Sequence, residues 1–273
     1  MKVLESVFGF YINSSVHVAL AVCAMVGVTT IEYQLNVPFE FWGFVFFGSI
    51  TGYNFVKYAG VAKFHHRSLT TALRAIQLFS LLSFGALVFF ALKLEVETLW
   101  ITAIFGLLTF LYTVPLFYHK SLRTLSGLKV LVVAMVWAGV TVVVPLASVG
   151  GSLDWDIMIT FVQRFLLVLV LTFPFEIRDL SYDAIALGTF PQRLGVKATK
   201  SLGVLMMSMV VVLELFKDLF YWDSFFTLTF VSLVLVVALL LSEKKQSKYF
   251  ASFWVESIPI LWYLLQLSFE ELF

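Results

Sequence analysis

Residues 173–195 read FPFEIRDLSYDAIALGTFPQRLG and follow a long apolar run. Three carboxylates, Glu176, Asp179 and Asp183, stand at positions i, i+3 and i+7, which places them within roughly 60° of one another on one face of a helix. Carboxylates this close repel one another unless a cation lies between them, and Mg²⁺ prefers oxygen ligands and bridges carboxylates to substrate phosphates. The spacing therefore indicates an Mg²⁺ site formed by these three residues. The alternative is a solvated helix end at which Arg178 forms a salt bridge with a carboxylate.

The composition places the chain in a membrane. Of its 273 residues, 61% are hydrophobic and 13% are charged, phenylalanine supplies 30, and the mean hydropathy is +0.98. A soluble domain usually carries about 25% charged residues, so the composition excludes an ordinary soluble protein, a disordered chain and a disulfide scaffold. The net charge of +1 gives no electrostatic reason to bind nucleic acid. The class that fits is an all-α polytopic membrane protein.

Apolar runs separated by polar breaks predict nine transmembrane helices. Each run has about 17–24 residues, the length that a membrane-spanning helix needs, whereas strands of a β-barrel would have about 10 residues with strict alternation. No linker rich in Pro, Gly or Ser divides the chain, so residues 1–273 are expected to form a single transmembrane domain. The predicted spans cover residues 8–30, 39–60, 69–92, 97–117, 126–148, 156–177, 200–216, 222–242 and 249–268.

The basic residues of the loops predict the orientation. With the N-terminus in the cytoplasm, only Lys93 and Lys217 among the 18 Lys and Arg residues fall in loops on the other side, and Arg164 lies inside a span. An excess of positive charge in cytoplasmic loops is the signal that orients membrane proteins. We therefore expect a cytoplasmic N-terminus and a C-terminus on the opposite side. The default location is an inner or plasma membrane, with the polar site of residues 173–195 facing the cytoplasm.

The acidic segment resembles the second aspartate-rich motif of the UbiA-type intramembrane prenyltransferases. That motif reads approximately D-x-x-D-x-x-x-D-x-x-x-G-x-x-T-L-P-x-x-L-G and follows the sixth of nine helices; here the three carboxylates precede Gly188 and the run TFPQRLG. A second stretch, residues 111–116 (LYTVPL), resembles the family's L-Y-S/T-x-P-L segment. The resemblance implies an Mg²⁺-dependent transfer of an isoprenyl group from an isoprenyl diphosphate to an acceptor, within a single UbiA-like membrane domain.

In this family, two aspartate-rich motifs face each other across a cytoplasmic cavity and hold the Mg²⁺ ions that bind the diphosphate. The first motif belongs at the end of the second helix, where residues 49–60 of this chain read SITGYNFVKYAG and contain no carboxylate. Asn54 matches the family's Asn, while Phe55 and Tyr58 replace its two Asp. Lys57 stands where a metal ligand is expected. It either contacts phosphate oxygens directly or forms a salt bridge with a carboxylate of the second motif that closes the site.

Carried over onto this sequence, the resemblance implies a substrate site of amide, basic and aromatic side chains beside the three carboxylates. Basic groups and metal would stabilise the leaving diphosphate, and an aromatic ring could stack on the allylic chain or cation. The residues expected to bind the isoprenyl diphosphate are Asn54, Lys57, Tyr112, Lys120, Arg178 and Arg193. Nothing in the sequence identifies the acceptor.

Three functions are compatible with these features. The first is a divergent prenyltransferase that works with one metal-binding motif and basic residues. The second is a non-catalytic protein of the same fold that binds a lipid, an isoprenoid or a protein partner. The third is a small transporter, in which charged residues within the spans would line a path. Arg164 is expected to pair with one of the acids in the spans, and the groups concerned are His17, Arg164, Glu214 and Glu256.

Overall fold

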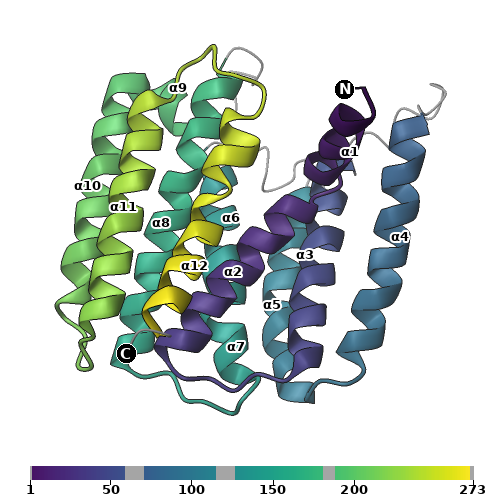
Figure 1. The fold of residues 1–273 in the computed structure, drawn as a ribbon, viewed down its shortest axis with the longest axis horizontal. Helices are drawn as coiled ribbons and strands as arrows, with labels where there is room; N and C mark the ends of the chain where they lie inside the picture. The colour runs from purple at the N-terminus through teal and green to yellow at the C-terminus, as the bar shows by residue number, and fades with distance from the viewer. Residues whose placement is uncertain (1, 59–70, 115–126, 181–187, 271–273) are drawn as a thin grey trace.

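The structure, a computed structural model, describes residues 2–58, 71–114, 127–180 and 188–270, and the regular secondary structure of these residues is helical (Figure 1). Two π-helical stretches, η3 (Gly139–Val143) and η5 (Phe250–Val255), interrupt the series. The α-helices are α1 (Lys2–Asn13), α2 (Val16–Glu32), α3 (Phe39–Tyr58), α4 (Thr71–Ala91), α5 (Val96–Thr113), α6 (Leu128–Ala138), α7 (Val144–Ala147), α8 (Trp155–Asp179), α9 (Phe190–Leu194), α10 (Val196–Glu214), α11 (Trp222–Leu241) and α12 (Ile258–Glu270).

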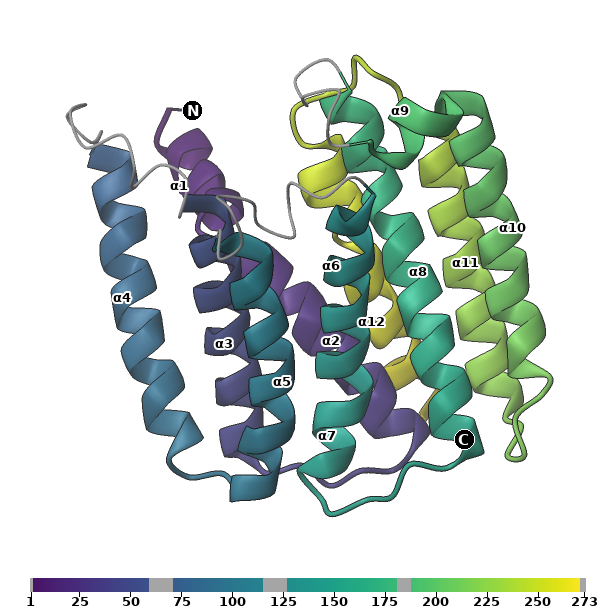
Figure 2. The ribbon, with the colours of Figure 1, turned by 180° about the vertical axis from the view of Figure 1, so that it is seen from behind.

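Successive long helices run in opposite directions, so the bundle has two ends (Figures 1 and 2). The chain begins at the end where α3 finishes at Tyr58 and α8 finishes at Asp179. We name this the motif end, because it carries the segments compared above with the aspartate-rich motifs. At the opposite end, α2 finishes at Glu32 and α10 finishes at Glu214.

The described residues confirm a multi-pass helical membrane protein. Seven helices are long and apolar enough to cross a membrane, and α1 and α2, which meet at a bend of 54°, make an eighth crossing if they are counted as one. The predicted span 39–60 corresponds to α3, which has 20 residues but falls outside this group. Its polar side chains, Glu40, Asn54 and Lys57 among them, lower its hydropathy. Nine crossings therefore stay a prediction.

α8 is the central helix of the bundle. It packs against α6, α10 and α11, and its segment from Leu167 to Leu171 is buried together with Phe173. This middle segment is apolar on every side, which suits such a position. By contrast, α4 and α5 leave many large apolar side chains exposed. Lipid tails are as apolar as leucine, so these faces are suited to contact with the bilayer.

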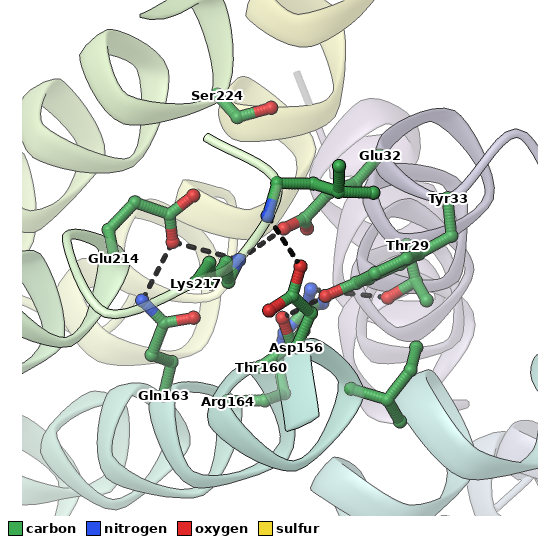
Figure 3. A network of polar contacts seen from close by, with 12 residues as sticks. Thr29, Glu32, Tyr33, Asp156, Thr160, Gln163, Arg164, Glu214, Lys217 and Ser224 are labelled. Atoms are coloured by element: carbon green, nitrogen blue, oxygen red, sulfur yellow. Dashed lines mark hydrogen bonds and ion pairs between the residues drawn. The ribbon is translucent and has the colours of Figure 1, made fainter. Parts of the chain in front are cut away.

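A buried ionic network lies at the opposite end of the bundle (Figure 3). Lys217, in the loop after α10, pairs with Glu32 of α2 and with Glu214, whose Oε2 lies 2.8 Å from Lys217 Nζ. Gln163 of α8 donates a hydrogen bond from Nε2 to the same oxygen at 2.8 Å. Burial disfavours the charged ammonium, but Glu32 and Glu214 more than offset this and raise the pKa of Lys217 above its ordinary value. Lys217, predicted as an ordinary loop residue, is thus part of the core.

Arg164 is buried in the same region by different partners (Figure 3). Its Nη1 donates to the carbonyl of Met25 at 2.7 Å, its Nη2 donates to Thr29 Oγ1 at 3.3 Å, and its guanidinium lies 4.7 Å from the centre of the Trp262 ring. No acid forms an ion pair within 4 Å of Arg164 in the described part of the chain. The expectation that it pairs with an acid in the spans is therefore corrected. A carbonyl, a hydroxyl and an aromatic face solvate this charge instead.

Candidate functional site

The carboxyl end of α8 brings Glu176 into the interior of the motif end. Its side chain is 2% exposed, its Oε2 accepts a hydrogen bond from the backbone N–H of Phe190 at 3.3 Å, and its Oε1 lies 3.8 Å from Nζ of Lys129 on α6. Because α9 begins at Phe190, Glu176 holds α9 against α8, and Lys129 offsets its charge. Lys129 was not predicted as a site residue. Its position at the start of span 126–148, at the same end as Glu176, is the signal that could have indicated it.

Arg178 and Asp179 form a bidentate ion pair at the end of α8. Arg178 Nε donates to Asp179 Oδ1 at 2.7 Å and Nη2 donates to Oδ2 at 3.1 Å, with both side chains about 30% exposed. This is the salt bridge expected if α8 ends in solvent. The third predicted metal ligand, Asp183, lies outside the described residues, as does Lys120.

The donor chemistry around Asp179 fits a magnesium ion better than that around Glu176. In the described residues, no group of three Asp, Glu, His or Cys side chains could hold a metal ion. Glu176 is enclosed by α9 and Lys129, whereas Asp179 is accessible, and a carboxylate has about four lone-pair sites. Asp179 can therefore offer lone pairs to a cation while Arg178 is bound. The complete Mg²⁺ site of Glu176, Asp179 and Asp183 stays a prediction.

The run TFPQRLG forms a short capped helix that closes the motif end. Thr189 and Gln192 make reciprocal hydrogen bonds in a capping box, with the Thr189 N–H donating to Gln192 Oε1 at 3.0 Å. Gly195 ends α9 with a φ of +81°, a conformation that favours glycine. Arg193 is exposed on this turn and its guanidinium lies beside Gly127, at the start of α6. The residues that carry the resemblance thus position α9 and one of the predicted phosphate-binding cations.

Asn54, at the position of the family's first motif, is buried and fully hydrogen-bonded. Its Oδ1 accepts from Ser15 Oγ at 2.8 Å, and its Nδ2 donates to the Ser14 carbonyl at 3.0 Å and to Ser80 Oγ at 2.8 Å. Ser15 adopts a φ of +66° at the bend between α1 and α2. Asn54 therefore ties this bend to α3 and α4. Its predicted contact with substrate would require these bonds to be exchanged.

Lys57 and Tyr58 also hold the bend between α1 and α2. Lys57 Nζ donates to Ser15 Oγ at 3.0 Å and approaches the Ile12 carbonyl at 3.5 Å, and Tyr58 Oη donates to the Asn13 carbonyl at 3.0 Å. In the described residues, Lys57 forms no ion pair with Asp179, whose partner is Arg178. The salt bridge between Lys57 and that carboxylate, which would have closed the site, is absent there.

We expect Asn54→Ala to destabilise the protein by about 2–3 kcal/mol, because a buried polar partner left without a hydrogen bond costs about 1–3 kcal/mol. The measurement is the free energy of unfolding in detergent micelles. Ser80→Ala removes only one of the three partners of Asn54 and should cost about 1 kcal/mol or less. An Asn54→Ala variant as stable as the wild type would contradict the structural assignment of this amide.

The predicted aromatic residue Tyr112 lies near the end of α5 and is buried. Nearby on α3, Tyr53 accepts a hydrogen bond on its hydroxyl from Trp137 Nε1 at 2.6 Å, and Phe55 stacks on Phe110 with ring centres 6.3 Å apart. Aromatic side chains of α3, α5 and α6 therefore come together in this half of the bundle. The contact of Tyr112 with an allylic chain stays a prediction.

Solved structures of known proteins share this fold. No protein-family profile and no curated protein sequence matches the chain. A solved structure of a UbiA homologue from Archaeoglobus fulgidus bound to GPP and Mg²⁺ is 12% identical, with a TM-score of 0.60 over 95% of this chain and 98% of that one. The same homologue bound to DMAPP and Mg²⁺ gives the same values. A structure from work on digeranylgeranylglyceryl phosphate synthase in membranes is 16% identical, with a TM-score of 0.57 over 97% and 98% of the two chains.

These comparisons show the fold. At such low identity they assign no activity, but they cover almost the whole of each chain. The protein is a multi-pass helical membrane protein with the fold of the UbiA-type prenyltransferases. The fold implied by the motifs of residues 111–116 and 173–195 is therefore confirmed.

Proposed function

We propose that the protein is a divergent member of the UbiA-type superfamily that binds an isoprenyl diphosphate at the motif end and transfers its prenyl group to an acceptor. The observation that carries this proposal is the similarity in fold, over 95% of the chain, to a homologue whose structures contain GPP or DMAPP with Mg²⁺. The carboxylates of α8 and the cation Lys57 of α3 lie at one end of the bundle, which supports a site between these helices (Figure 1).

The roles of the residues follow from charge. Glu176, Asp179 and Asp183 would hold Mg²⁺, which when bound stabilises negative charge on the leaving diphosphate. Phosphate oxygens would accept hydrogen bonds from four basic residues, Lys57, Lys120, Arg178 and Arg193. These residues would replace the Mg²⁺ ion that the first aspartate-rich motif holds in the family and that this chain has no carboxylates at that position to bind. The allylic carbon–oxygen bond breaks, its electron pair leaves with the diphosphate, and the acceptor forms the new bond to that carbon. Tyr112 would contact the allylic chain.

The same proposal includes the arrangement in the membrane. Nine crossings, with α1 and α2 as one bent crossing and α3 as another, would put the two termini on opposite sides, with the N-terminus in the cytoplasm. The motif end then faces the cytoplasm of an inner or plasma membrane. The distribution of Lys and Arg over the loops supports this orientation.

The test is the binding of geranyl diphosphate to the protein in lipid nanodiscs, with and without Mg²⁺. Saturable binding that needs Mg²⁺ is the expected result, and it would justify a screen for the acceptor. Binding of the same affinity without Mg²⁺ would overturn the metal site and leave the basic residues as the phosphate clamp. No binding in either condition would contradict the proposed substrate.

A second function, lipid or isoprenoid binding without turnover, is favoured by one observation. Asn54 and Lys57 hold the bend of the first crossing, and so two residues at the position of the first motif have structural partners. Binding of geranyl diphosphate without any diphosphate release, across a panel of acceptors, would support it. The transporter has less support, because the α8 side chains buried between Arg164 and Glu176 are apolar and provide no polar connection along this helix.

A further inference from the structure

Glu256 differs from the other charged groups inside the predicted spans. His17, Arg164 and Glu214 all have hydrogen-bond or ion-pair partners. The Glu256 carboxylate has no hydrogen bond and no ion pair within 4 Å in the part of the chain that the structure describes, and it is partly exposed. An ionised carboxylate without a partner is costly at this depth unless it faces water or the polar groups of a ligand. The partial exposure of this unpaired carboxylate therefore points to water or a polar ligand beside it.

The backbone around Glu256 is irregular and firmly held. Glu256 follows the π-helix η5, a type of distortion that is frequent at functional sites. His17 Nε2 lies 3.1 Å from the Phe253 carbonyl oxygen and 3.3 Å from Ser257 Oγ, while His17 Nδ1 lies 2.7 Å from Tyr11 Oη. The segment that carries Glu256 is thereby fixed against α1 and α2, close to the bend that Asn54 and Lys57 also hold.

Two cations lie on elements that pack around the segment of Glu256. η5 packs against α8, which carries Arg178, and His17, which contacts Phe253 and Ser257, lies two residues from Ser15, the partner of Lys57. Both cations are near enough to act electrostatically on the Glu256 carboxylate. Each cation is held elsewhere, Lys57 by Ser15 and Arg178 by Asp179, and neither contacts Glu256 within 4 Å. One carboxylate and two cations from three distant parts of the sequence thus come to the motif end, and within the described residues no contact joins Glu256 to either cation.

We infer that Glu256 is the charge-balancing carboxylate of a phosphate-binding site whose cations are Lys57 and Arg178. Without a ligand, its negative charge offsets the positive charge of Lys57, which forms no ion pair within the described residues, while Arg178 is paired with Asp179. A phosphate-bearing ligand, either an isoprenoid lipid or a free diphosphate, takes over that function and is repelled by Glu256 as it binds. The inference rests on the proposed function for the identity of the lipid, but the charge arrangement applies to any phosphate group.

The test compares the affinities of Glu256→Gln and wild-type protein in nanodiscs for geranyl diphosphate and for inorganic diphosphate. Removal of a like charge a few ångströms from the ligand should tighten binding by about tenfold or more, since a unit charge at that range is poorly screened inside a protein. Glu243→Gln is the matched control. It removes one negative charge from an exposed position in the loop after α11, at the same end, and should leave the affinity unchanged.

A double variant tests whether the effect of Glu256 depends on Lys57. In a Lys57→Met background, Glu256→Gln should tighten binding by less than in the wild type, because one of the cations that it balances is gone. In thermal unfolding, inorganic diphosphate should stabilise Glu256→Gln more than the wild type, because the variant binds the anion more tightly.

The outcomes separate this inference from the proposed function. If Glu256→Gln binds both ligands more tightly than the wild type, the inference is supported for the phosphate group alone. If only geranyl diphosphate is bound more tightly, the inference is supported for the isoprenoid lipid. If the wild type does not bind geranyl diphosphate but Glu256→Gln binds inorganic diphosphate, the charge-balancing assignment stands and the proposed substrate fails. If the wild type binds geranyl diphosphate and Glu256→Gln binds it no more tightly than Glu243→Gln, the inference is overturned. The absence of any diphosphate effect on any variant overturns it as well.

Discussion

Replacement of Lys217 by methionine is expected to destabilise the folded protein by about 3–5 kcal/mol, the cost of breaking a buried ion pair by removing one partner. The side chain is 3% exposed and serves two carboxylates, Glu32 and Glu214, which would be left buried together without a counter-charge. Two carboxylates that share one ammonium group would repel each other once that group is removed, and neither would be solvated by water. The measurement is the free energy of unfolding by denaturant in detergent micelles.

The control is Lys93→Met. Lys93 pairs with Glu40 at 3.9 Å, but the two side chains are 45% and 36% exposed, and exposed pairs contribute about 0–1 kcal/mol. A Lys217→Met variant that loses no more stability than Lys93→Met would contradict the assignment of the network to the core. A second change, Glu214→Gln in the Lys217→Met background, should recover part of the loss because it removes one of the stranded charges.

The dependence of this effect on pH follows from the direction of the shift. Because the folded pKa of Lys217 is raised, its contribution is fully present below the unfolded pKa of about 10.4 and is lost only as pH rises through the higher folded pKa. The stability difference between wild type and Lys217→Met should therefore stay constant from pH 7 to about pH 10 and shrink above that.

The second large effect is expected at the end of α8. Asp179→Asn and Asp183→Asn should each weaken Mg²⁺-dependent binding of geranyl diphosphate by about tenfold to a hundredfold, since a bond to a charged group is worth about 1.5–3 kcal/mol. Asp223→Asn, in the first turn of α11 at the opposite end, is the matched control and should bind normally. Affinity in the absence of Mg²⁺ should change little or increase, because each substitution removes a negative charge.

Substitution of Asp179 also releases Arg178 from a bidentate ion pair. If Asp179→Asn strengthens binding in both the presence and the absence of Mg²⁺, Arg178 and not the metal dominates recognition. Equal affinity of wild type, Asp179→Asn and Asp183→Asn in Mg²⁺ would contradict a metal site at this end.

Much of the fold could be predicted because the bilayer imposes a simple rule on sequence. An apolar run of the right length, such as residues 222–242, reappears as α11 (Trp222–Leu241), and the α8 run reappears as the central helix. The bend of 54° in the first span could not be predicted, since it is held by hydrogen bonds with Asn54 and Lys57, about 40 residues away. The interruption Asn13-Ser14-Ser15 was visible in the sequence, but the polar partners that hold it were not.

The candidate site was predicted in part for the same reason. Local spacing placed Glu176 and Asp179 at one helix end, which the structure shows. Tertiary contacts then changed their environment, because Lys129 and Phe190 enclose Glu176 while Arg178 binds Asp179. Lys217 looked like a loop residue and Arg164 like half of an ion pair, and only the packing of α2, α8 and α12 decides which groups meet.

The most direct test of the central claim is a structure of the protein in nanodiscs with geranyl diphosphate and Mg²⁺. The account predicts the diphosphate at the motif end between α3 and α8, with Mg²⁺ on Asp179 and Asp183, phosphate oxygens within hydrogen-bond distance of Lys57 or Arg178, and the geranyl chain toward Tyr112. Diphosphate bound at another place, or a motif end that stays free of ligand at saturating concentration, would contradict it.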